Sequence, residues 1–109
     1  MVQRMEKTMK SETVCGIGRE ILDKIPKHPN TINGADLAYA CGLTSSAMVR
    51  RQVNALRTAG FPIISTQDGY SIATDSKQIE DCIRSLRSRV ASIEEAIYGL
   101  YKSFGAVAQ

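Results

Sequence analysis

Residues 34–72, GADLAYACGLTSSAMVRRQVNALRTAGFPIISTQDGYSI, decide the fold of this chain. Their first part, residues 35–41, has the length of a two-turn helix with Leu37 and Ala38 directed inward. Gly42 follows at the point where a helix end often needs a residue with positive φ. This part of the sequence therefore predicts a short helix that ends in a tight turn.

A second helix is predicted directly after that turn. Thr44 or Ser45 can cap it, because a side-chain oxygen at this position accepts a free backbone N–H. The helix is expected to run to about Ala59 and to end at Gly60. Helical periodicity places three apolar residues on one buried face, namely Val49, Val53 and Leu56. The opposite face then carries Ser46, Ala47, Arg50, Arg51 and Asn54.

Two short strands are predicted after Gly60, over residues 62–67 and 70–73. Asp68-Gly69 lies between them and is a signal for a two-residue type I′ turn, in which both residues take positive φ. The sequence before residue 34 predicts a brief strand or extended link at residues 30–34. Ahead of that link, a helix is predicted from Ser11, with one apolar face made of Val14, Ile17, Ile21 and Ile25.

The order helix, strand, helix, turn, helix and hairpin is that of a winged helix. The fold class is therefore predicted as mainly α with a small β-hairpin (α+β), followed by a long C-terminal helix. We expect a flexible basic arm at residues 1–10, a winged helix-turn-helix domain at residues 11–74, and a C-terminal helix at residues 75–109.

The C-terminal segment has the strongest periodic pattern in the chain. Its apolar residues alternate spacings of four and three over nearly four heptads, which is typical of a coiled coil. With Ile79 at position d, the seam of a and d positions is Ile79, Ile83, Leu86, Val90, Ile93, Ile97, Leu100 and Phe104. We expect this seam to mediate dimerisation, although it can alternatively dock on the winged domain of its own chain.

Residues 34–72 resemble the winged helix-turn-helix at the start of biotin-repressor proteins and in DeoR-type regulators. Ala38, Gly42 and the three apolar positions of the second helix carry part of this resemblance. Its most specific part is Leu56, Arg57, Gly60, Ile63 and the run from Gly69 to Ile72. The resemblance implies binding to double-stranded DNA and does not imply any biotin-related activity.

The polar face of the second helix has the chemistry to read DNA. Arginine recognises guanine and asparagine recognises adenine through paired hydrogen bonds, and a helix N-terminus favours a phosphate. The candidate DNA-binding residues are Ser45, Ser46, Ala47, Arg50, Arg51, Asn54, Arg57, Thr66 and Gln67. The alternative interpretation of the three arginines is an ordinary solvated helix face.

Other function classes lack support in the sequence. There is no phosphate-binding glycine loop, no HExxH motif and no nucleophile elbow, so no enzyme is expected. Cys15, Cys41 and Cys82 are far apart, and His28 is the one histidine, so neither a metal nor another cofactor is expected. No secretory signal or membrane span is evident, and we expect a cytoplasmic, nucleoid-associated protein.

Three functions remain open on the sequence. The first is a sequence-specific transcriptional regulator that binds a two-fold symmetric DNA site as a homodimer. The second is an assembly adaptor, in which the winged helix is kept and the C-terminal helix binds a different protein. The third is a DNA-binding component of phage replication or packaging.

Overall fold

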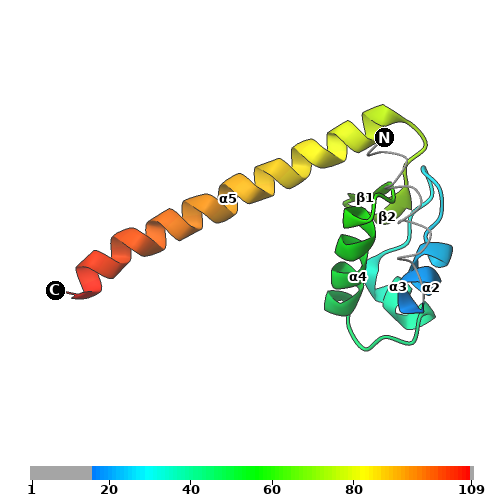
Figure 1. Ribbon diagram of the computed structural model, residues 1–109, viewed down its shortest axis with the longest axis horizontal. Coiled ribbons are helices and arrows are strands. Elements are labelled where there is room, and N and C mark those ends of the chain that lie inside the picture. The colour runs from blue at the N-terminus through cyan, green and yellow to red at the C-terminus, as the bar shows by residue number, and fades with distance from the viewer. Residues whose placement is uncertain (1–15, 109) are drawn as a thin grey trace. The chain divides into compact units, whose positions relative to one another are not determined.

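The computed structural model describes residues 16–108, so the predicted basic arm at residues 1–10 lies outside the described residues. The chain divides into two compact units, one that ends at Ile79 and one that begins at Glu80. The first contains helices α2, α3 and α4 and a two-stranded hairpin, and the second contains most of helix α5 (Figure 1). The predicted fold class is confirmed: the described chain is mainly helical, with one small antiparallel hairpin.

Helix α2 spans Ile17–Lys24 and corrects the prediction of a helix that runs on from Ser11. Gly16, which precedes it, has φ 57° and ψ −129°, and this conformation interrupts any helix that reaches it from the N-terminal side. Residues 11–15, Val14 included, lie outside the described residues. At its other end the helix stops because Ile25 takes an extended conformation before Pro26.

An extended link joins α2 to the next helix, as predicted, and it runs beside the hairpin. Lys27 forms an isolated parallel bridge with Ile72, and Ile32 forms an antiparallel bridge with Tyr70. The buried Ser71 hydroxyl donates a hydrogen bond to the Asn30 carbonyl oxygen at 2.8 Å. The link therefore lies beside the second strand of the hairpin and pairs with it at isolated positions.

Helices α3, Gly34–Ala40, and α4, Ser46–Thr58, form the predicted pair around a tight turn. Gly42 in that turn has φ 70°, the left-handed conformation expected of it. Of the two predicted caps, Ser45 performs the role, because its Oγ accepts the backbone N–H of Met48 at 3.4 Å. Side-chain capping thus sets the starting residue of α4.

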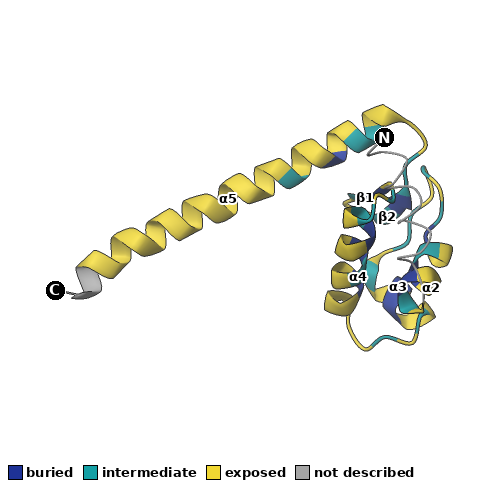
Figure 2. Ribbon diagram, in the orientation of Figure 1, coloured by how far each residue is buried: buried dark blue, intermediate teal, exposed yellow. Residues whose placement is uncertain are grey.

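The core of the first unit is aliphatic and lies between the three helices and the first strand (Figure 2). It confirms the predicted inward faces of α3 and α4. Of the face predicted for the first helix, Ile21 and Ile25 are buried and Ile17 is partly buried against the core. Each fully buried aliphatic side chain contributes about 1.5–3 kcal/mol through the hydrophobic effect. The buried cluster consists of Ile21, Ile25, Leu37, Ala38, Val49, Val53, Leu56 and Ile63.

The hairpin consists of β1, Ile63–Thr66, and β2, Gly69–Ile72. Its register pairs Thr66 with Gly69, so the two loop residues are Gln67 and Asp68. The predicted type I′ turn is wrong, because no residue other than glycine has positive φ in the described chain. The Thr66 hydroxyl stabilises the turn instead, since it accepts the Asp68 N–H at 3.1 Å and donates to the Gly69 carbonyl at 3.3 Å.

Gly69 is required by the close approach of another segment. Its φ is 141°, and a Cβ built on it would lie 2.4 Å from the Ile32 carbonyl oxygen. That carbonyl accepts the Tyr70 N–H at 2.8 Å, which holds the link against β2. A side chain at this position would therefore separate the link from the hairpin.

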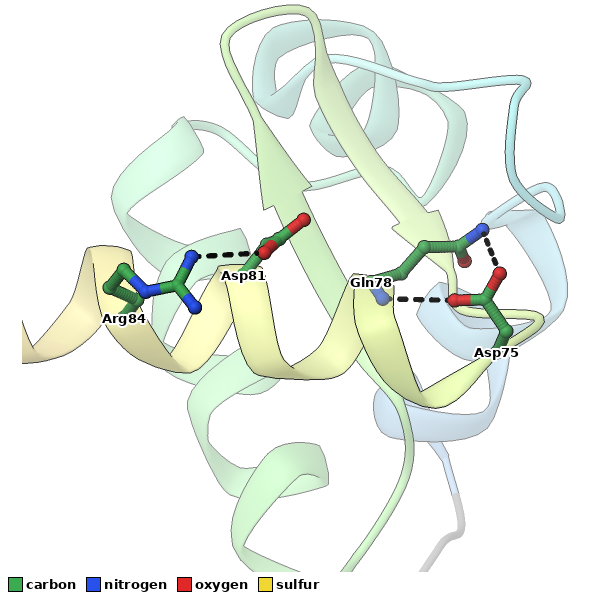
Figure 3. A network of polar contacts seen from close by, with 4 residues as sticks. All are labelled: Asp75, Gln78, Asp81 and Arg84. Atoms are coloured by element: carbon green, nitrogen blue, oxygen red, sulfur yellow. Dashed lines mark hydrogen bonds and ion pairs between the residues drawn. The ribbon is translucent and has the colours of Figure 1, made fainter.

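Helix α5 spans Ser76–Ala108 and extends past the predicted seam. Asp75 caps it, because its carboxylate accepts the backbone N–H of Gln78 at 2.9 Å (Figure 3). One turn further, Arg84 and Asp81 form an exposed ion pair at 3.1 Å. None of the helices within the described residues has the length and apolar character needed to cross a membrane.

We predict that Gly69→Ala lowers the free energy of unfolding by about 2–4 kcal/mol, because it adds backbone strain and a collision with Ile32. Chemical denaturation followed by circular dichroism measures this change. Gly18→Ala is the matched control, since its new Cβ would meet only ordinary contacts at 3.8 Å and 3.9 Å. The control is expected to be neutral or to stabilise by up to about 1 kcal/mol. Equal stability of the two variants would contradict the role assigned to Gly69.

Candidate nucleic-acid interface

The two faces of α4 differ sharply in burial. Val49 and Val53 are 0% and 1% exposed, and they hold the helix against α2 and α3. The opposite face lies at the surface, as the yellow outer side of α4 in Figure 2 shows. All five residues predicted on that face are exposed: Ser46, Ala47, Arg50, Arg51 and Asn54. The structure therefore brings these candidate residues together on one accessible helix surface.

Arg50, Arg51 and Asn54 supply the polar chemistry of this surface. Neither arginine forms a hydrogen bond or ion pair with another residue that the structure describes. The Asn54 side chain also forms no hydrogen bond with the described residues, since only its backbone carbonyl accepts one. Their donors and acceptors therefore face solvent and require no internal bond to be broken before they meet a ligand. A guanidinium has a planar fork of donors, and a carboxamide has one donor group and one acceptor.

The N-terminal end of α4 adds backbone donors to the same surface. Ser45 uses its hydroxyl to cap the Met48 N–H, so its side chain serves the helix. The N–H groups of Ser46 and Ala47 belong to the first turn, where no carbonyl of the helix can accept them. Together with the partial positive charge of the helix terminus, they favour an anion.

Gly34 packs against this end of α4, a contact that the sequence pattern did not predict. A Cβ built on Gly34 would lie 3.2 Å from the Ser46 Cβ, so the start of α3 packs tightly against the start of α4. Asn33 caps α3 immediately before it, accepting the Asp36 N–H at 2.8 Å. A glycine directly after a capping asparagine, where a better helix former is usual, is the signal that identifies such a contact.

Arg57 differs from the other candidate arginines, because its guanidinium is bonded to the hairpin. Its Nε donates to the Ile63 carbonyl oxygen at 2.7 Å, and its Nη2 donates to the Ser65 hydroxyl at 3.2 Å. The residue is half-buried. It therefore connects the last turn of α4 to β1.

The tip of the hairpin presents a short polar wing. Thr66, Gln67 and Asp68 are all exposed. The Thr66 hydroxyl is engaged in the turn, which leaves the Gln67 carboxamide as the neutral hydrogen-bonding group at the tip. The Asp68 carboxylate would repel a phosphate, so the wing chemistry favours contact beside the backbone over deep insertion.

No group of three or more histidine, cysteine or acidic residues in the described part of the chain is arranged to hold a metal ion. Burial and the nearby Glu20 carboxylate raise the pKa of the Cys41 thiol. Since the thiolate is the reactive form of cysteine, this shift lowers the reactivity of the Cys41 thiol.

Comparison with known proteins finds a similarity in the same region. Residues 19–71 match the family model described as an HTH domain. The matched segment includes all of α3, α4 and β1, most of α2, and β2 as far as Ser71. No curated protein and no solved structure matches the chain.

We predict that Arg57→Met, which keeps an apolar stem and removes the donors, lowers the free energy of unfolding by about 1–3 kcal/mol. The reason is that the Ile63 carbonyl and the Ser65 hydroxyl lose their partner. Arg51→Met on the exposed face of the same helix is the control, and it is expected to change stability by less than about 0.5 kcal/mol. Denaturant titration of both variants gives the comparison. Similar values for the two would show that the hairpin contact of Arg57 is not stabilising.

Proposed function

Because residues 19–71 form a winged helix-turn-helix domain, a DNA-binding fold, we propose that the protein is a homodimeric transcriptional regulator. It recognises a specific sequence in double-stranded DNA. The observation that carries this proposal is the exposed polar face of α4, whose opposite face is held in the core. A helix anchored in this way can enter a major groove as a rigid element.

Base recognition is assigned to the middle of α4. Arg50 and Arg51 donate to the O6 and N7 atoms of guanine, and Asn54 pairs with the N7 atom and N6 amino group of adenine. The N–H groups at the start of the helix bind a backbone phosphate and fix the depth of insertion. Gln67 contacts the sugar-phosphate backbone from the wing, and Thr66 holds the turn that presents it. Arg57 positions the wing and adds positive charge next to the phosphates.

Dimerisation is assigned to the seam on α5. Most of its members are exposed in the single chain, from 42% at Ile83 to 72% at Phe104. Exposed apolar residues in a regular a and d pattern are stabilised when a second helix covers them. A dimer doubles the number of recognition helices, and two half-sites supply the affinity and specificity that one small domain lacks. We place this regulator in the cytoplasm, on the nucleoid.

The alternative of an assembly adaptor draws on the distal end of α5. Tyr98, Tyr101 and Phe104 are 66%, 75% and 72% exposed, so this end is rich in exposed aromatic surface. Aromatic residues are enriched in protein interfaces. Under this alternative the winged domain would have little affinity for DNA, and α5 would bind a different protein.

We predict that the wild-type protein binds a labelled random-sequence duplex with an affinity that falls steeply with salt. Arg50→Ala/Arg51→Ala is expected to reduce the slope of log K against log[salt] by about 1–2. On a random duplex, where no matching guanine is in place, these arginines contact phosphates, and each contact that is lost releases about one counterion fewer. On a selected operator the same variant should bind at least about tenfold more weakly, since each arginine–guanine pair discriminates by about 1–3 kcal/mol. Fluorescence anisotropy across a salt series measures both effects.

Arg19→Ala/Lys24→Ala is the matched control, because it removes the same charge from exposed positions on α2. It should leave the affinity nearly unchanged apart from the small effect of net charge. Equal losses in the two double variants would refute the placement of the site on α4. No binding at low salt would favour the adaptor.

A further inference from the structure

The outer surface of α4 contains an apolar side chain that has no part in the proposed phosphate and base contacts. Ala47 lies in the first turn of the helix and is exposed. We infer that the Ala47 methyl group contacts the 5-methyl group of a thymine, so that each recognised half-site contains a thymine at this place. The inference rests on the proposed binding of α4 in a major groove, and it specifies one base of the target.

Ala47 shares one line of the helix surface with two residues that are assigned to bases. Arg51 follows it after four positions and Asn54 after seven, and these spacings return to the same side of an α-helix. All three residues are exposed. In helix-turn-helix complexes the N-terminal residues of the recognition helix contact base edges. Base contacts by Arg51 and Asn54 therefore bring the Ala47 side chain to the floor of the same groove.

The first turn of α4 is held in place by the rest of the domain. The Ser45 hydroxyl accepts the backbone N–H of Met48 at 3.4 Å, which fixes where the helix begins. A Cβ built on Gly34 would lie 3.2 Å from the Ser46 Cβ, so α3 packs directly against this turn. The Ala47 methyl group therefore keeps its direction when the helix enters a groove.

A methyl group discriminates among the chemical groups at the floor of a major groove. All four bases present hydrogen-bond donors or acceptors there, and thymine alone adds a methyl group. A methyl group placed against a donor or acceptor removes that group from water without supplying a partner, which costs free energy. Against the thymine methyl group, the same side chain buries apolar surface on both partners. Thymine is therefore the base that an alanine at this place favours.

Met48 is the other exposed apolar residue in this part of α4, and it lies on a different side of the helix. Its side chain is 40% exposed, and its sulfur accepts a hydrogen bond from the Thr44 hydroxyl at 3.3 Å. Successive residues of a helix are about 100° apart around the axis, so Met48 points away from the line of Ala47. Gln52, one turn after Met48, lies beside Gly18 of α2. Met48 therefore belongs to the side of α4 that is turned toward α2.

Removal of single methyl groups from the DNA tests the inference with the wild-type, full-length protein. An operator is selected from random sequences and then remade with each thymine of one half-site replaced in turn by deoxyuridine, which differs only in the 5-methyl group. One replacement is expected to weaken binding by about fourfold, because this factor corresponds to the burial of one methyl group. Fluorescence anisotropy measures the affinity for each duplex.

A matched pair of protein variants assigns the effect to a side chain. Ala47→Gly removes the proposed partner, so the same replacement of thymine should then change the affinity by less than about 1.5-fold. Ala55→Gly is the control, because it removes a methyl group from an exposed position of α4 that is about 12 Å further along the axis. It should keep the wild-type effect at that thymine. Any loss of helix stability acts equally on both duplexes and cancels in the ratio of affinities.

The possible results separate the inference from the proposed function. A thymine effect that disappears in Ala47→Gly and persists in Ala55→Gly supports the inference. It is overturned if no thymine is sensitive, if the effect is unchanged in Ala47→Gly, or if both glycine variants abolish it. In these three cases the tight binding of the selected operator still supports the proposed function. If no operator can be selected from random sequences, sequence-specific recognition and the thymine contact are both refuted.

Discussion

The packing of Val49, Val53 and Leu56 against α2 and α3 is the contact on which the arrangement of the first unit depends. These residues recur on one side of α4, so their burial leaves the helix no freedom to rotate about its axis. Rotation by one residue would bury an arginine and expose a valine, which costs free energy on two counts. The same packing that stabilises the unit therefore selects which side chains face solvent.

A second set of contacts connects this core to the hairpin. The Arg57 guanidinium bonds the end of α4 to β1, and the link at Ile32 bonds to β2 on its other side. Gly69 makes the second contact possible, because only a residue without Cβ admits the Ile32 carbonyl. The wing is thus fixed to the helix by hydrogen bonds from two directions, although the hairpin itself is only four residues deep. A two-stranded hairpin of this length would be marginal alone.

Helix α5 differs from the first unit in the exposure of its apolar residues. Its apolar residues form a narrow stripe, and Figure 2 shows the helix exposed along nearly its full length. A stripe of a and d residues is too narrow to build a core within one chain and is well suited to a second helix. The first unit buries its apolar residues within itself, whereas the stripe on α5 stays largely exposed in the single chain. The proposed function accordingly assigns DNA recognition to α4 and dimerisation to α5.

The sequence by itself determined the order of the elements, the buried faces of α2, α3 and α4, and the apolar stripe on α5. These features follow from local periodicity, which depends only on the geometry of a single helix. Tertiary structure decided the rest. Arg57 looks like any surface arginine in the sequence, and its bonds to the hairpin exist only because the chain folds back onto α4. Gly69 resembles a turn glycine. A side chain is excluded there by the close approach of Ile32, which is 37 positions earlier in the chain. The residues of the α4 surface were predictable because helical geometry is local, whereas the contacts that orient the wing join segments whose proximity no local pattern encodes.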